Sequence, residues 1–284
     1  MNEFRKTLRL LTRNTAGLIG LIGVLFIVVV SFIGPMVVPP ADTADVSNIY
    51  SGPTAEHPLG TDFQGRDNLT QLIYGGKDII IIAVVAGVLT VLIAVVVGSV
   101  AAFMGGRVDG VLREVINVWL TIPQFPLLAI LATLLRLSNV ALLSVIIAVL
   151  SWPSLALQVR AQMLSLRKRE YVEAATLLDL GTAHIILREM VPNIAPFLAI
   201  SLIFAMTSAI YQQTGLVFLG LVPFSSANWG VTISLAYAKG AHFQADSAWS
   251  LLAPVVAIVF FQLALVSLSR SLEEVFNPRL RTEV

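Results

Sequence analysis

Side chains able to perform acid–base, nucleophilic or metal chemistry are few in this sequence and lie far apart. There is no cysteine, which excludes disulfides, thiolate metal sites and a cysteine nucleophile. The histidines His57, His184 and His242 are not near one another, so no metal site is expected. No G-x-x-x-x-G-K-[ST] sequence is present for a nucleotide-binding loop. These absences lead us to expect no catalytic residue. The net charge of +1 gives no indication of a nucleic-acid partner, and none is expected.

The most distinctive polar stretch is Glu170–Asn193, which lies between long apolar runs. Four of its residues recur at helical spacing and predict one stripe along a helix: Tyr171, Ala174, Ala175 and Leu178. A glycine can end such a helix, because it tolerates the left-handed conformation of a C-cap, and Gly181 follows. A second helical run precedes Pro192. The stretch therefore predicts a helix, a turn and a second helix.

Two interpretations of this helix pair remain open from its residues alone. Small side chains such as the two alanines let a groove wall approach closely, and an amphipathic helix laid into a groove is a common mode of protein recognition. The alternative is a helix that rests on lipid headgroups, with Arg167, Lys168 and Arg169 attracted to anionic lipid.

The composition places these residues in a membrane protein. The chain of 284 residues is 57% hydrophobic and 12% charged, whereas a soluble domain has about 25% charged residues. About 20 apolar residues cross a bilayer as a helix, and six runs qualify: Thr15–Val38, Ile79–Met104, Val115–Leu135, Asn139–Val159, Ile194–Leu221 and Leu251–Leu268. We predict an all-α integral membrane protein with six transmembrane helices. The third run is the weakest, because it contains Pro123 and Pro126.

Basic residues set the expected orientation. They concentrate before the first span, between spans two and three, between spans four and five, and after the last span. The positive-inside rule then places both termini and the Glu170–Asn193 segment in the cytoplasm. Two long outer segments result, Val38–Asp78 and Val222–Trp249. Trp152, Trp229 and Trp249 lie near span ends and are expected to act as headgroup anchors.

Polar residues within the spans are candidates for a translocation path. The span centres carry no charged residue, which argues against a proton-coupled carrier, because intramembrane charges commonly mark ion pathways. The uncharged candidates are Gln124, Tyr211, Gln212, Gln213 and Thr214. An interfacial position or bonding between helices is the alternative for them.

A charged cluster is expected in the first outer segment. Asp62, Arg66 and Asp67 lie close together around Gly65. They either contact a soluble partner or pair locally around a turn.

The Glu170–Asn193 stretch resembles the EAA loop of permease subunits in ABC importers of bacteria and archaea. Glu173, Ala174, Ala175 and Pro192 match that motif, as does the 19-residue interval between Glu173 and Pro192. The resemblance implies that this loop sits in a cleft of an ATP-binding subunit and transmits nucleotide-driven closure to the pore.

One residue departs from the family pattern. The family glycine usually follows the second alanine by a few residues, where this chain has Asp179, and its glycine comes later at Gly181. Either Asp179 makes the turn, or the turn moves to Gly181 and lengthens the first helix by about 3 Å at 1.5 Å per residue.

Further stretches resemble the dipeptide and oligopeptide subfamily over almost the whole chain. They are "HPLGTDFQGRDNLTQLIYGGKDI", "AAFMGGRVDGVLREVINVWLTIPQFPLLAI", "TGLVFLGL", "NWGVTISLA" and "NPRL". The division expected from the spans and this resemblance is an anchor helix and extracytoplasmic segment at 1–78, a transmembrane domain at 79–270 with the loop at 170–193, and a cytoplasmic tail at 271–284.

The resemblance implies a peptide permease in the cytoplasmic (inner) membrane, assembled with partners. These are a second permease, two ATP-binding subunits that hold ATP and Mg, and an extracytoplasmic solute-binding protein. The chain itself would hold no cofactor. Alternatives are a permease for oligosaccharides or nickel chelates, a self-sufficient channel or secondary carrier, and a structural or signalling membrane protein.

Overall fold

The computed structural model describes residues 14–40, 43–137, 139–222 and 228–276, and within these ranges it is built almost entirely of helices. Five helices are long and apolar enough to cross a membrane, and the count rises to six if one bent pair forms a single span. The crossing helices are α2 (Thr15–Val37), α3 (Asn68–Met104), the pair α4 (Gly106–Thr121) and α5 (Gln124–Leu134), α6 (Val140–Arg167), α9 (Ala195–Phe218) and α11 (Ala248–Phe276). The prediction of an all-α membrane protein is confirmed.

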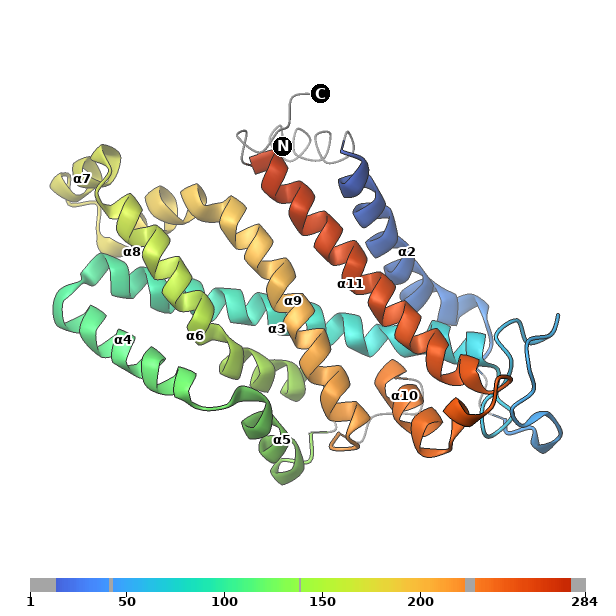
Figure 1. Ribbon diagram of the computed structural model, residues 1–284. Coiled ribbons are helices and arrows are strands. Elements are labelled where there is room, and N and C mark those ends of the chain that lie inside the picture. Colours follow the sequence, from blue (N-terminus) through green and yellow to red (C-terminus); the bar gives the residue numbers. More distant parts are fainter. Residues whose placement is uncertain (1–13, 41–42, 138, 223–227, 277–284) are drawn as a thin grey trace.

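Successive crossings run in alternate directions along the bundle (Figure 1). The short helix α7 (Glu170–Leu177) projects at one end, which we call the α7 end, and the start of α2 and the end of α11 lie at the same end. The opposite end, called the α10 end, carries α10 (Trp229–Ala238) and the connection between α2 and α3. Residues 1–13 and 277–284, with several of the basic residues used to predict orientation, lie outside the described residues.

The third crossing is broken where the sequence places its prolines. The axes of α4 and α5 differ by 78° across the break. Ile122 is extended, with φ −80° and ψ 123°, because the ring of the following Pro123 disfavours the helical conformation in the residue before it. Pro126 lies in the first turn of α5, where a missing N–H leaves no bond unmade. The predicted span exists, but as two short helices that begin earlier, at Gly106.

Helix α3 lies at the centre of the bundle and packs against α2, α4, α6, α9, α10 and α11. Small residues allow the closest approaches. A Cβ at Gly98 of α3 would lie 2.6 Å from the carbonyl oxygen of Ala156 in α6, and one at Gly20 of α2 would lie 2.7 Å from the amide nitrogen of Leu268 in α11. Close approach through small residues is the usual way in which helices associate in a membrane.

Two elements at the α10 end differ from the prediction. Helix α3 begins at Asn68 rather than at Ile79, because the carboxylate of Asp67 caps it and accepts a bond of 2.7 Å from the amide of Thr70. The expected outer loop contains the ten-residue helix α10. Its Trp229 is buried, 1% exposed, and donates from Nε1 to the carbonyl of Leu72 at 2.7 Å. Trp229 is therefore a core residue, and its prediction as a headgroup anchor was wrong.

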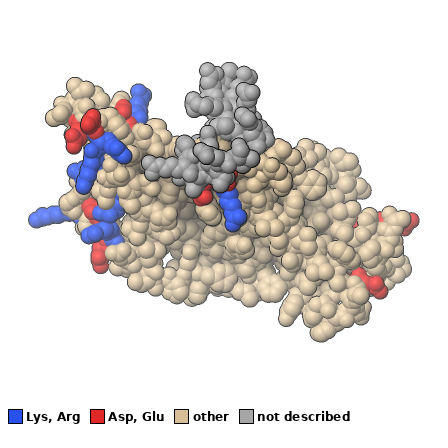
Figure 2. Space-filling model, turned by 45° about the horizontal axis from the view of Figure 1, so that its top comes forward, with Lys and Arg blue, Asp and Glu red and all other residues tan. Residues whose placement is uncertain are grey.

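Charged and apolar residues are separated along the molecule. On the face shown in Figure 2, Lys and Arg gather at the α7 end, and uncharged residues dominate the wide band between the two ends. Large apolar side chains of the crossing helices are exposed, among them Leu92 and Val96 of α3 and Leu263 of α11. A surface of this kind is suited to lipid or to another membrane subunit.

We predict opposite effects for alanine at two helical glycines. Gly98→Ala should lower the stability by about 1–3 kcal/mol, because its methyl group meets the backbone of α6. Gly110→Ala is the matched control, since nothing lies within 4 Å of its Cβ position, and it should raise stability by about 0.5–1 kcal/mol. Thermal unfolding of the two purified variants compares them. Equal shifts would contradict the proposed close contact of α3 and α6.

Candidate functional site

One side of α7 is fixed to the body of the protein. Val172 and Ala175 are buried, 1% and 5% exposed, in an apolar cluster that also contains Met163 of α6 and Met190. Full burial of a valine is worth about 1.5–3 kcal/mol. Because this cluster joins α7 to α3, α4 and α6, the short helix is attached to the bundle by packing as well as by its covalent connections.

The other side of α7 is open. Tyr171 and Ala174 are exposed, and Leu177 and Leu178 are 88% and 72% exposed. The predicted stripe of Tyr171, Ala174, Ala175 and Leu178 is therefore split between two faces. The predicted buried face of the helix is rotated by about one residue from the observed one. Val172, which is entirely apolar, faces the bundle with Ala175, whereas the amphipathic Tyr171 is partly exposed.

The turn after α7 is made by Asp179. This residue has φ 54°, in the left-handed region that aspartate tolerates better than most residues. The amide of Asp179 donates to the carbonyl of Thr176 at 3.1 Å, and the amide of Leu180 donates to Ala175 at 3.3 Å. These two bonds form a Schellman motif. The hypothesis of a turn at Asp179 is confirmed, and the lengthened helix was wrong, since α7 ends at Leu177.

Gly181 begins the second half of the segment, with φ 78°. The chain then continues without a break through α8 (Thr182–His184), a π-helical turn η2 (Ile185–Met190) and a 3-10 turn η3 (Val191–Ile194) into α9. Ile185, Ile186 and Met190 face the same apolar cluster as α7, whereas Pro192 is exposed in η3. The predicted helix–turn–helix is present, and its second helix is directly joined to a membrane-crossing helix.

A hollow lies at the base of α7. It has a volume of about 480 Å³ and is lined by Phe103, Arg167, Val172, Glu173, Thr176 and Leu177. Arg167 donates from Nη1 to the carbonyl of Ala102 at 3.1 Å, which holds the guanidinium against the end of α3. The hollow combines apolar walls with one charge of each sign.

Two of the predicted path residues meet inside the bundle. Gln124, at the break between α4 and α5, donates from Nε2 to Ser151 Oγ at 2.5 Å and to Gln212 Oε1 at 3.1 Å. Gln212 donates in turn to Ser151 at 3.2 Å and to Ser208 at 3.1 Å. We call Gln124, Ser151, Ser208 and Gln212 the glutamine cluster. It ties the broken span to α6 and α9.

A polar cavity adjoins the glutamine cluster. It lies between α3, α6 and α9, has a volume of about 240 Å³, and shares Ser151 and Ser208 with the cluster. Its polar lining consists of Thr90, Ser151, Ser154, Gln158, Ser201 and Ser208. Sequence reasoning missed this wall, because none of these six residues was among the predicted path residues. The available signal was the helical spacing of Ser151, Ser154 and Gln158 on α6, matched by Ser201 and Ser208 on α9.

The remaining predicted path residues do not line this cavity. Tyr211 is 63% exposed on the bundle surface. Gln213 is fully buried, and neither its amide nitrogen nor its oxygen has a hydrogen-bond partner among the described residues. Thr214 Oγ1 is buried and unpartnered in the same way. The predicted group is therefore spread over several sides of α9, and only Gln212 joins Gln124.

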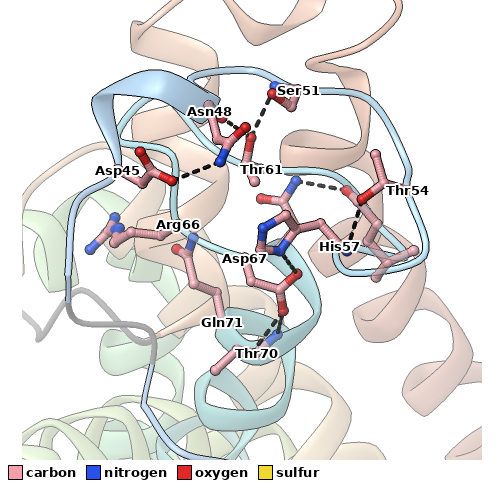
Figure 3. A network of polar contacts seen from close by, with 12 residues as sticks. Asp45, Asn48, Ser51, Thr54, His57, Thr61, Arg66, Asp67, Thr70 and Gln71 are labelled. Carbon is pink, nitrogen blue, oxygen red and sulfur yellow. Dashed lines mark hydrogen bonds and ion pairs between the residues drawn. The ribbon is translucent and has the colours of Figure 1, made fainter.

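The charged cluster at the α10 end forms a compact network (Figure 3). Asp62 is 3% exposed and accepts from Arg66 Nε and Gln71 Nε2, each at 2.9 Å. Asp67 caps α3 and contacts His57 Nδ1 at 3.1 Å. The observed pairs agree with local pairing around the turn at Gly65, where φ is 75°.

Asp45 belongs to the same network and lies earlier in the connection between α2 and α3. Its side chain accepts bonds from the hydroxyl and amide of Ser47 and from Asn48 Nδ2. These bonds, first that from the Ser47 hydroxyl, lower the pKa of Asp45 below its ordinary value. A Cβ at Gly65 would lie 1.8 Å from the carbonyl oxygen of Asp45, so only glycine fits this contact.

The apolar crossings, the external helix pair and the polar cavity define a multi-pass membrane protein with features of a transport subunit. Residues 94–282 match the family described as binding-protein-dependent transport system inner membrane component. Residues 3–53 match the N-terminal transmembrane domain of oligopeptide transport permease C. The chain belongs to this family, as a permease subunit of the dipeptide and oligopeptide type of ABC importer.

Named relatives align over most of this chain. A Brucella suis protein with the provisional name peptide permease protein is 32% identical over 83% of this chain and 77% of its own length. The dipeptide transport system permease protein DppC of Bacillus subtilis is 30% identical over 96% of this chain and 85% of its own. The oligopeptide transport system permease protein OppC of Mycobacterium tuberculosis is 30% identical, with 99% and 98% covered.

We predict that the Asp62–Arg66 pair stabilises the connection between α2 and α3. Asp62→Ala leaves the guanidinium of Arg66, whose side chain is 11% exposed, without its carboxylate, which should cost about 3–5 kcal/mol. The expected result is protease cleavage within residues 43–67. Glu56→Ala is the control, because its side chain is exposed in the same segment and its loss should leave that segment resistant. Equal resistance of both variants would contradict the structural role of Asp62.

Proposed function

We propose that this chain is the transmembrane permease subunit of an ATP-driven peptide importer, and that it couples closure of ATP-binding subunits to alternating access. The names of the relatives support peptides as the substrate class. The proposed complex contains a second permease, two ATP-binding subunits and an extracytoplasmic solute-binding protein. ATP and Mg are bound by the ATP-binding subunits, and this chain is non-catalytic.

The proposed orientation places the α7 end and both termini in the cytoplasm. Eight described basic residues lie at or near the α7 end: Arg107, Arg113, Arg160, Arg167, Lys168, Arg169, Arg188 and Arg270. Four lie toward the α10 end: Arg66, Lys77, Arg136 and Lys239. This difference follows the positive-inside rule. The Asp45–Gly65 connection and α10 then face the outside.

The observation that carries the proposal is the continuity between α7 and the cavity walls. Helix α6 leads directly into α7, and the second half of the segment leads directly into α9. These same two helices provide Ser151, Ser154 and Gln158 on one wall and Ser201 and Ser208 on the other. A displacement of α7 therefore acts on both walls of the polar cavity.

The exposed face of α7 provides the contact for an ATP-binding subunit. Ala174 allows a close approach because it has only a methyl group, and Tyr171 and Leu178 flank it with apolar surface. A permease responds to nucleotide only if its inward-open and outward-open states interact differently with the nucleotide-bound partner. The apolar cluster around Val172 transmits that difference, since it holds α7 against α3, α4 and α6.

We predict that Ala174→Arg abolishes coupling while the permease still assembles in the membrane. The arginine would fill the space needed by the partner groove without disturbing the buried side of α7. Peptide uptake by the reconstituted importer should fall by at least ~10-fold, equivalent to about 1.4 kcal/mol. ATP hydrolysis should no longer respond to the loaded solute-binding protein.

Two matched variants sharpen this experiment. Ala174→Ser keeps a small side chain at the same position and should retain uptake. Ala175→Arg places the same arginine on the buried face, 5% exposed, and should reduce the amount of folded permease instead. Normal uptake by an assembled Ala174→Arg complex would refute docking through this face of α7.

A further inference from the structure

The polar cavity offers hydrogen bonds of both kinds and no charge. Its polar lining consists of hydroxyl groups and one carboxamide, and none of its lining residues is ionisable. Arg160 follows Gln158 closely on α6, but its guanidinium is held by Asp109 of α4, with Nε–Oδ1 2.5 Å and Nη2–Oδ2 2.6 Å. The nearest charge along α6 is therefore already paired.

The glutamine cluster bounds the cavity on the side away from α7. The cavity residues of α9 run from Ser201 to Ser208, and Gln212 follows one turn further toward the α10 end. On α6 the direction is reversed: Gln158 lies nearer α7, and Ser151 marks the cluster. Bonds from Gln124 to Ser151 and Gln212 cross this position. Carboxamide groups thus form the boundary of the cavity at this end. An amide group of a ligand could form the same kinds of hydrogen bond as these carboxamides.

The size and chemistry of the cavity fit part of a peptide chain. Its volume of about 240 Å³ is below the ~300–1,000 Å³ typical of sites that enclose a drug-sized ligand. Each peptide unit has one N–H donor and one carbonyl acceptor, and serine and glutamine side chains can serve both. Serine hydroxyls can also donate to a carboxylate or accept from an ammonium group, so this lining favours neither sign of charge.

We propose that the polar cavity is a subsite for the peptide main chain and does not discriminate between acidic and basic side chains. This inference rests on the proposed peptide-import function and deepens it. Ser154 is the central residue for a test, because it is exposed in the cavity wall between Ser151 and Gln158. Selection by charge then depends on other parts of the importer.

The test introduces one charge of either sign into this wall. Uptake of Ala-Lys-Ala and Ala-Glu-Ala is measured with the complete importer, and the ratio of the two is divided by the wild-type ratio to remove the preference of the solute-binding protein. Ser154→Asp should shift this ratio at least ~5-fold toward the lysine peptide, and Ser154→Lys should shift it at least ~5-fold toward the glutamate peptide. Ser165→Asp, two turns beyond Gln158 on α6 and exposed, should leave the ratio unchanged.

The proposed subsite would be overturned if the Ser154→Asp and Ser154→Lys complexes assemble and transport peptide but keep the wild-type uptake ratio of the two peptides. Absence of any peptide uptake by the wild-type importer would instead overturn the proposed function. The two failures are therefore distinguishable.

Site-specific labelling gives a second readout that does not depend on turnover by a charged variant. The chain has no cysteine, so Ser154→Cys is the only thiol of this subunit. Its reaction with a small neutral thiol reagent should slow at least ~5-fold in the importer when Ala-Ala-Ala is supplied with the solute-binding protein, and Ser165→Cys should react at an unchanged rate. Protection by a trisaccharide but not by the tripeptide, or protection by neither, would overturn the inference.

Discussion

The attachment of α7 to the bundle is the interaction on which the proposed mechanism depends. An external helix of eight residues can move membrane helices only if it is held to them on more than one side. Val172 and Ala175 provide this hold through Met163 and Met190, and α6 and α9 provide the covalent connections. Exposed residues and residues that face the bundle alternate along the same two turns, so in the proposed mechanism recognition and transmission are separated by rotation about one helix axis.

The broken third span brings an uncharged polar cluster between the described helices. Pro123 prevents a continuous helix, and the interruption places Gln124 where its carboxamide reaches α6 and α9. Irregular backbone is tolerated at membrane depth where it is buried in protein or lines a cavity. Meanwhile α3 packs closely on α6 through Gly98. One side of α6 thus has fixed neighbours, while its other side lines an open space.

The sequence predicted the large features of the fold well, because long apolar runs can cross a membrane only as helices. It also indicated the helix–turn–helix, but it left the turn open between Asp179 and Gly181, and only the backbone conformation decides for Asp179. Three features were not accessible in the same way. Trp229 lies in a helix too short to cross a membrane, and only tertiary contacts show that its ring is buried. The face of α7 was misjudged because Val172 and Tyr171 are both compatible with burial. The serines of the cavity resemble ordinary packing residues until α6 and α9 are placed side by side.

Because α7 is short, its exposed surface depends on prior folding of the rest of the subunit. A helix of fewer than about 12–15 residues is marginal in water by itself, and the Schellman turn at Asp179 closes only around an already helical α7. The surface that presents Ala174 and Leu178 therefore exists when Met163 and Met190 are already packed beneath it. In the proposed complex, a partner that binds this surface would therefore select chains that have finished folding.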